Sequence, residues 1–238
     1  MTYDGRLIVN STQLRQTSPP DGNDREKPLG GIVGCDSRIG NTMLNRKTFF
    51  IREHVGLIKL SNTYDILDPE GEGRLGIAQE RPGGFVHVLR LLVSKQHLPT
   101  KVFVYEGNDP KDESRLIFSI QRGFTLFRSK VRICDAQGNV IGGLKSKLFS
   151  LGGAFRVFDS AGQQIAMVKG DWKGWNFRLL DNAENEIGTI TKKWAGLGKE
   201  LFTSADNYVI ALTQEPKPSE AILLLAAGLA VDTVYKES

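Results

Sequence analysis

The chain of 238 residues has only two cysteines, Cys35 and Cys134, and three methionines. Two cysteines in a chain of this length exclude a disulfide scaffold and a cysteine-rich zinc module. The sequence does not open with a basic stretch followed by an apolar one, so no secretory leader is predicted. We therefore expect an intracellular protein.

The sequence also lacks the motifs that accompany catalysis. His54, His87 and His97 do not have metal-ligand spacing, and there is neither a Gly-x-Ser-x-Gly elbow nor a phosphate loop ending in Gly-Lys-Ser/Thr. Cys134 ends an apolar run and is expected in the core rather than as a nucleophile. These absences predict that the protein is not an enzyme.

Composition is otherwise typical of a globular protein, with 40% hydrophobic and 24% charged residues. The net charge of +4 permits anionic partners without requiring them. The basic excess is uneven: residues 121–200 hold 13 Lys and Arg against 7 Asp and Glu, whereas residues 201–238 hold 2 against 5. An anion-facing surface is therefore predicted in the third quarter of the chain.

The first 44 residues differ from the rest. They carry five basic and five acidic residues, several prolines and no sustained apolar period, which predicts a loosely ordered arm over 1–44. From about Thr48, short runs of β-branched and aromatic residues have the length of strands. We expect one domain over residues 45–238.

A repeated hairpin pattern organises that domain. Each copy has an apolar strand end, a turn that begins with Asp, and a second strand, and the three turns begin at Asp135, Asp159 and Asp181. Hairpins that follow one another without helices predict an antiparallel up-and-down sheet. We expect about ten to twelve strands between residues 48 and 213, closed into a barrel because closure removes exposed strand edges.

One helix is predicted, at about residues 220–235, with Ser219 as its N-cap. Residues 221–231 are apolar on every side, so this is not a surface helix. Eleven residues span about 17 Å, less than the roughly 30 Å of a bilayer core, and Asp232 follows them. A helix that fills the lumen of a twelve-stranded barrel is favoured over one that crosses a membrane.

The end of the chain carries a family resemblance. Residues 187–197 read IGTITKKWAGL, residues 200–208 read ELFTSADNY, and the apolar helix follows. This order resembles the closing segment of the phospholipid scramblases, and the preceding hairpins are similar to the wider tubby-like superfamily, which includes the LURP-one-related proteins. The resemblance is specific over residues 187–238, extends in layout over 48–186, and is absent over 1–44. It implies a twelve-stranded barrel around the C-terminal helix.

The resemblance also implies a calcium loop, but the sequence departs from it. Ser204 stands where the family has Asp, and Val209 replaces the glycine of the bend, whereas Asp206, Asn207 and Glu215 remain possible ligands. The sequence therefore predicts weak calcium binding or none, and no other cofactor. The alternative is a strand followed by a polar turn.

Five cations are the first candidates for binding an anion. If the strands that carry them are neighbours, Arg128, Lys130, Arg132, Lys145 and Lys147 converge on one face and fit a phosphate or lipid headgroup. The alternative is an ordinary solvated barrel exterior.

A second group combines tryptophans and lysines. Aromatic rings beside cations fit a membrane interface, and they fit ordinary hairpin packing equally well. The group comprises Trp172, Lys173, Trp175, Lys192, Lys193 and Trp194.

Three classes of function are compared with these features. The first is a cytoplasmic, scramblase-related protein that binds anionic phospholipid or phosphoinositide headgroups at the inner face of the membrane, without a transmembrane span. The second is a scaffold or regulatory module that uses the same barrel for a protein or nucleic-acid partner. The third is an enzyme, and no catalytic motif in the sequence supports it. Resemblance of fold does not establish that lipid is scrambled.

Overall fold

The computed structural model describes residues 41–54, 62–69, 73–81, 98–123, 130–146, 154–171, 174–192 and 207–232. The chain divides into two units, residues 1–34 and 35–238, and every described residue lies in the second. The described residues form twelve strands, two α-helices and one short 3-10 helix, η2 (Glu113–Arg115).

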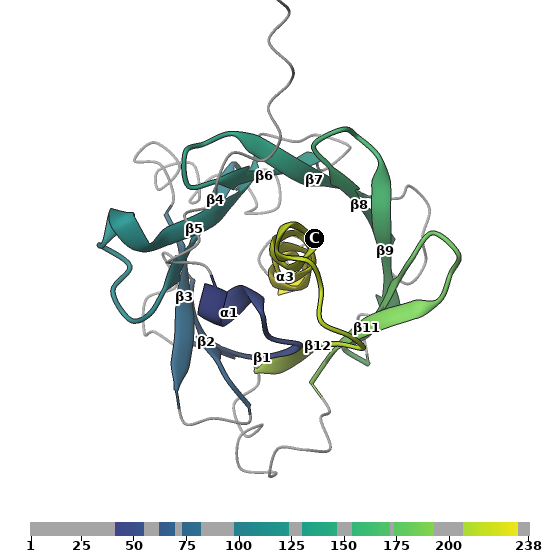
Figure 1. The fold of residues 1–238 in the computed structure, drawn as a ribbon, viewed down its shortest axis with the longest axis horizontal. Coiled ribbons are helices and arrows are strands. Elements are labelled where there is room, and N and C mark those ends of the chain that lie inside the picture. Colours follow the sequence, from purple (N-terminus) through teal and green to yellow (C-terminus); the bar gives the residue numbers. More distant parts are fainter. Residues whose placement is uncertain are drawn as a thin grey trace, which may run out of the picture. The chain divides into compact units, whose positions relative to one another are not determined.

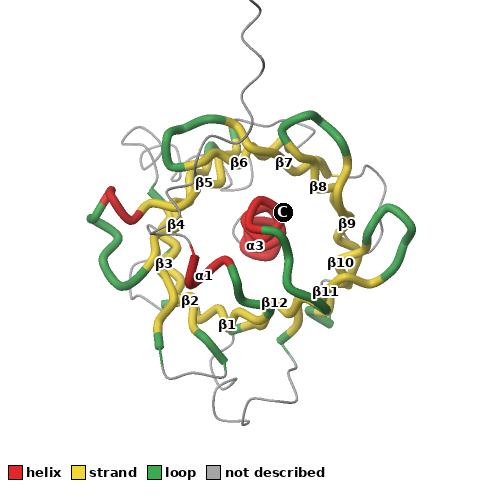
Figure 2. The backbone as a smooth tube through the Cα atoms, viewed as in Figure 1, coloured by secondary structure: helices red, strands yellow, loops and turns green. Residues whose placement is uncertain are grey.

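The twelve strands form one closed antiparallel barrel (Figures 1 and 2). Each strand pairs with the next one in sequence, and β12 pairs with β1 through Phe50 opposite Val209 and Ile51 opposite Tyr208. The predicted fold class is therefore confirmed. The strands are β1 (Thr48–Glu53), β2 (Thr63–Leu67), β3 (Arg74–Glu80), β4 (Thr100–Glu106), β5 (Leu116–Arg122), β6 (Lys130–Asp135), β7 (Val140–Ser146), β8 (Ala154–Asp159), β9 (Gln164–Asp171), β10 (Asn176–Leu180), β11 (Glu186–Thr191) and β12 (Tyr208–Leu212).

The three Asp-led repeats are hairpins with one turn design. The Asp135 Oδ1 atom accepts hydrogen bonds from the backbone N–H groups of Gln137, at 3.0 Å, and Asn139, at 2.8 Å. Asp181 repeats this pattern two hairpins later, with Ala183 and Asn185 as donors. These side chains satisfy backbone donors that the turn leaves unpaired, so Asp fixes where each strand ends.

The turns also require a left-handed backbone position. Gly138 and Gly162 occupy it with φ of 85° and 77°, and Glu184 occupies it in the third turn with φ of 64°. Glycine adopts this conformation without steric cost, whereas Glu184 does not. The Glu184 carboxylate lies 2.8 Å from the ammonium of Lys169 on the neighbouring strand β9, an interaction that favours glutamate in this turn.

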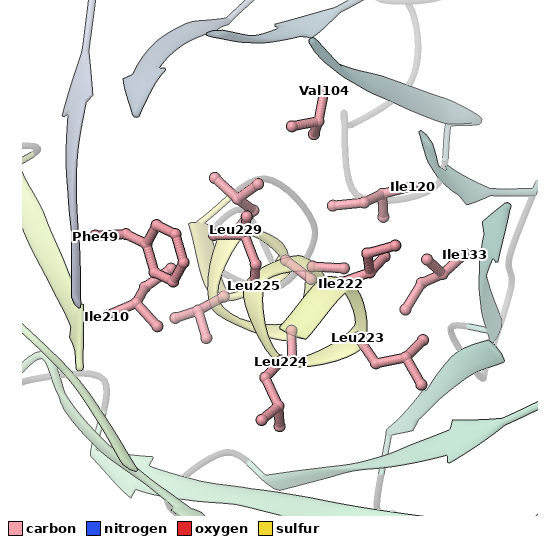
Figure 3. Packing of buried hydrophobic residues seen from close by; sticks show 14 of the residues in the cluster. Phe49, Val104, Ile120, Ile133, Ile210, Ile222, Leu223, Leu224, Leu225 and Leu229 are labelled. Atoms are coloured by element: carbon pink, nitrogen blue, oxygen red, sulfur yellow. The ribbon is translucent and has the colours of Figure 1, made fainter. Parts of the chain in front are cut away.

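The C-terminal helix α3 (Pro218–Ala230) lies inside the ring of strands (Figure 1). Residues 221–230 are all buried, and the leucines of α3 face wall residues that include Phe49, Val104, Ile133 and Ile210 (Figure 3). Among the described residues, no helix has the length and apolar character that a bilayer crossing needs. The helix α3, which is apolar on every side, is thus surrounded by apolar residues of the barrel wall.

The start of α3 corrects the sequence prediction. Lys217 rather than Ser219 is the N-cap residue, and its side chain makes no capping hydrogen bond. Pro218 occupies the first helical position, where its fixed φ suits the helix and its missing N–H is not needed. The helix ends at Ala230 and a π turn continues to Asp232, so the predicted end near residue 235 lies outside the described residues.

Two glycines mark where the helix and the wall approach closely. A Cβ atom on Gly142 of β7 would lie 2.5 Å from Leu223 Cδ2, and a Cβ atom on Gly228 would meet the side chain of Ile210 on β12. Contacts this short are not tolerated between carbon atoms, so glycine at these positions allows the helix to fit the lumen.

A short helix, α1 (Asn41–Leu44), precedes β1. Met43 and Leu44, which the sequence analysis assigned to the arm, are 0% and 2% exposed and belong to the main hydrophobic cluster. Side chains just before the first strand therefore contribute to the core.

Candidate anion-binding surface

Three cations lie side by side on the outer wall of the barrel. Lys130 of β6 is directly opposite Lys145 of β7, and Lys145 is directly opposite Arg156 of β8. Side chains of directly opposite residues in antiparallel strands have Cβ atoms about 5 Å apart. Arg132, two residues after Lys130, extends this row on the same face of β6. We call Lys130, Arg132, Lys145 and Arg156 the cationic face.

The alternation of side chains along each strand exposes this face. On β6, Lys130 and Arg132 are exposed while Val131 and Ile133 are 3% and 0% exposed in the barrel core. Neighbouring residues of a strand point to opposite sides of the sheet, so a core-facing Val131 and Ile133 require outward-facing cations between them.

The cationic face carries uncompensated charge. None of its four side chains forms an ion pair within the described part of the chain. The next pair of facing cations, Lys169 of β9 and Arg178 of β10, differs because Lys169 contacts Glu184 at 2.8 Å. Like charges directly opposite each other destabilise a sheet. Within the described ranges, the cationic face thus lacks the carboxylate that its neighbour has.

An aromatic ring lies beneath one of the cations. The Lys145 Nζ atom is 4.2 Å from the centre of the Phe158 ring. Phe158 is opposite Gly143 on β7, which has no side chain to cover the ring. The ring attracts the ammonium group and holds Lys145 over the wall.

Sequence reasoning identified part of this face. Strands β6 and β7 are neighbours, as the prediction for Lys130, Arg132 and Lys145 required, while Arg128 and Lys147 lie outside the described residues. Arg156 was missed. The alternation of residues 155–157 marks it as outward-facing, but only the register of β7 and β8 places it beside Lys145.

The tryptophan and lysine group is described in part. The Trp175 ring packs edge-on against Phe177, with centroids 5.9 Å apart, and lies 5.3 Å from the Tyr208 ring. Lys192 Nζ lies 4.5 Å from the Trp175 ring centre. The ring therefore joins the end of the core, and contact with a membrane stays a prediction. Trp172, Lys173, Lys193 and Trp194 lie outside the described residues.

The proposed calcium ligands belong to different surroundings. Asn207 is 5% exposed and immediately precedes β12, Val209 is fully buried within that strand, and Glu215 is exposed after it. Asp206 lies outside the described residues. Within the described ranges, no three His, Cys, Asp or Glu side chains are grouped to hold a metal ion. The segment between Asn207 and Glu215 contains strand β12 followed by a bend.

A polar cluster inside the barrel holds the end of α3. The Tyr64 hydroxyl donates a hydrogen bond of 2.7 Å to Asp232 Oδ2 and accepts one of 3.1 Å from Asn62 Nδ2. Burial, together with the nearby Asp232 carboxylate, raises the pKa of Tyr64 and that of Tyr208 well above their ordinary value. Tyr64 therefore remains a donor and anchors the helix terminus to β2.

Cys134 is part of the core, as predicted. Its side chain is 3% exposed, and burial raises the pKa of its thiol. A buried thiol of raised pKa is a poor nucleophile.

These features define a class of protein: a closed antiparallel barrel of twelve strands that encloses an apolar helix and carries cations on its outer wall. The family model named Scramblase matches residues 43–238, so the chain belongs to the scramblase family. Neither the curated proteins nor the solved structures contain a match to the chain.

Proposed function

We propose that the protein binds anionic phospholipid surfaces through the cationic face, as a peripheral, non-catalytic and scramblase-related protein. The observation that carries this proposal is the row of Lys130, Lys145 and Arg156 on three consecutive strands, without an ion-pair partner among the described residues. Family membership supports a role with lipids.

The row suits an extended anionic surface better than a single small ion. Its side chains project from a sheet, and adjacent strands are about 4.8 Å apart, so the charges are spread along the wall. Each basic residue beside an anionic membrane contributes about 1 kcal/mol. Three cations together therefore change affinity on the order of 100-fold. Clusters of Lys and Arg are typical of phosphatidylserine and phosphoinositide binding.

Binding through the outer wall leaves α3 in place. The helix is enclosed by the strands and makes its contacts within the core. The surface that meets lipid is then the wall itself, with Lys145 and its Phe158 ring near the centre of the row. Because anionic lipids are concentrated in the cytoplasmic leaflet, we place the protein at the inner face of the membrane.

Co-sedimentation with vesicles tests this function. Vesicles of phosphatidylcholine alone are compared with vesicles that also contain phosphatidylserine, at low and high salt. We expect binding only with phosphatidylserine, weakening steeply with salt because exposed charges are screened beyond about 10 Å at 0.1 M. A further preparation containing a phosphoinositide distinguishes general charge attraction from preference for that headgroup.

Matched variants locate the surface. Replacing Lys130, Lys145 and Arg156 with Gln should lower affinity on the order of 100-fold, because three cations are lost. The control replaces Lys47, Lys111 and Lys217, three exposed lysines elsewhere, with Gln and removes the same charge. Equal losses in both variants, or none in the first, would reject the cationic face. If the wild type ignores anionic vesicles at low salt, the lipid function fails and a module for a protein or nucleic-acid partner replaces it.

A further inference from the structure

A second group of cations surrounds a buried carboxylate on another part of the wall. Asp65, in the middle of β2, is 0% exposed. Its Oδ2 atom lies 2.7 Å from Arg52 Nη2 and 2.9 Å from His54 Nε2, and its Oδ1 atom lies 3.1 Å from Arg74 Nη2. We call these four side chains the Asp65 cluster.

The charges of the Asp65 cluster do not balance. Two arginines and one carboxylate leave a net charge of +1 when His54 is neutral and +2 when it is protonated. The nearby carboxylate of Asp68 is 2.9 Å from Arg46 and therefore has a cation of its own. Burial pushes the pKa of Asp65 upward, but hydrogen bonds from Arg52 and His54 outweigh it, so its pKa lies below the ordinary value. Asp65 thus remains an anion, and the excess charge is positive.

The excess charge faces outward. Asp65 is covered, whereas the side chains of Arg52 and Arg74 are 45% and 29% exposed. Arg52 donates a hydrogen bond from Nη2 to Asp65 Oδ2, whereas Arg74 Nη2 forms an ion pair with Oδ1 that lacks hydrogen-bond geometry. The other N–H groups of both arginines make no hydrogen bond to the described residues. A guanidinium group has five donors in a rigid plane that matches carboxylate and phosphate oxygens. Asp65 therefore orients both arginines through one nitrogen atom each, and their other N–H groups are available to a ligand.

The Asp65 cluster and the cationic face lie on opposite sides of the barrel. In the closed ring of twelve strands, β2 is six strands from β8 in either direction. The two strands lie on opposite sides of α3 (Figure 2). A flat membrane that contacts β6 to β8 cannot also contact β1 to β3. A ligand of the Asp65 cluster is therefore separate from the lipid surface already proposed.

We propose that Arg52, His54 and Arg74, oriented by Asp65, form a second anion site that takes a phosphate monoester group. A phosphate monoester carries up to two negative charges and several acceptor oxygens, which match the residual charge and the unused donors of the arginines. The phosphate belongs either to a small molecule in solution or to a headgroup of a second membrane. This site is independent of lipid binding through the cationic face.

The probe is inorganic phosphate, exchanged for chloride at constant ionic strength and followed by NMR of the arginine side-chain Nε–Hε signals. We expect saturable shifts of the Arg52 and Arg74 signals at millimolar phosphate, unchanged in the Lys130, Lys145 and Arg156 to Gln variant. Absence of a saturable shift in the wild type overturns the site.

Two double variants separate binding from folding. Arg52→Gln with Arg74→Gln should abolish phosphate binding, but it also leaves Asp65 buried with fewer partners. Arg52→Lys with Arg74→Lys keeps the charges and the ion pairs while removing the planar donors. This conservative variant should retain its melting temperature and bind phosphate several-fold more weakly. Undiminished binding in both variants, measured by calorimetry, overturns the site.

Vesicle clustering identifies the source of the phosphate. If the site takes a headgroup, the wild type should cluster vesicles that contain phosphatidylinositol 4-phosphate, and the Lys double variant should bind them without clustering. Phosphate binding without clustering assigns the site to a phosphorylated molecule in solution. Failure of the cationic face would abolish sedimentation with phosphatidylserine vesicles but leave the arginine NMR shifts intact, so the two proposals fail separately.

Discussion

The inner and outer faces of strands β6 to β8 differ in chemistry: successive residues of each strand point alternately into the lumen, where they are apolar, and outward, where several are basic. Inside, Val131, Ile133 and Leu144 contribute to the apolar lumen around α3. Outside, Lys130 and Lys145 lie next to each other in the register of the sheet. The inward-facing residues are needed to pack the core. The outward-facing cations lie next to like charges and are not needed for packing. Stability and binding are therefore expected to respond to different residues of one strand.

The largest effect is expected where a charge enters the lumen. Leu224 of α3 is 6% exposed. Leu224→Asp would bury a carboxylate without a partner, at a cost of several kcal/mol, and should abolish folding. Circular dichroism and solubility are the readouts, and Leu224→Met is the control because it conserves volume and apolar character. A folded, soluble Asp variant would show that the helix is not enclosed.

A substitution at the close contact between α3 and β12 tests how tightly the helix fits the barrel wall. Gly228→Ala places a methyl group against Ile210, and overpacking of this kind costs typically 1–3 kcal/mol, more than the roughly 1 kcal/mol that alanine gains in helix propensity. Chemical denaturation should show net destabilisation. Adding Ile210→Val removes the Cδ1 atom that the methyl group meets and should restore part of the loss. A stabilised single variant would contradict the contact.

The inner polar cluster should matter less than the enclosed position of Leu224. Tyr64→Phe removes the 2.7 Å hydrogen bond to Asp232 and leaves that carboxylate with one donor fewer, at an expected cost of about 1–3 kcal/mol. Tyr105→Phe is the matched control because the Tyr105 hydroxyl donates to Glu113, which is exposed. Equal free energies of unfolding for the two variants would mean that Tyr64 does not anchor the helix end.

The smallest effect on stability is expected on the outer face. Replacing Lys130, Lys145 and Arg156 with Gln removes facing like charges without opening the core, but it also removes the attraction between Lys145 and the Phe158 ring. The two effects oppose each other, so the free energy of unfolding should change by about 0.5 kcal/mol or less. Thermal unfolding without vesicles measures it. A loss comparable to that of Gly228→Ala would show that these side chains support the fold.

Local patterns predicted much of the fold. Alternating apolar residues and the Asp-led turns at Asp135, Asp159 and Asp181 indicated an antiparallel barrel, because each feature acts within one hairpin. The uniformly apolar segment indicated an enclosed helix. The start of that helix was misplaced because Ser219 is a good N-cap by propensity, whereas Pro218 fits the first helical position.

The candidate sites depended on register, which local patterns do not encode. Lys145 meets Arg156 because β7 and β8 pair at those positions. The Asp65 cluster joins residues of three strands through one buried carboxylate, and no spacing in the sequence relates Arg52 to Arg74. Such groupings become visible only when the strands are aligned.

Hydrogen exchange with and without anionic vesicles tests most directly whether lipid meets the outer wall while the helix remains inside. The amides of Ala221 to Ala230 should exchange slowly in both conditions, because their release requires opening of the barrel. Vesicles should leave that protection unchanged while they bind the wild type. Fast exchange of these amides on vesicles would show that the helix leaves the lumen, and would contradict a peripheral attachment through the cationic face.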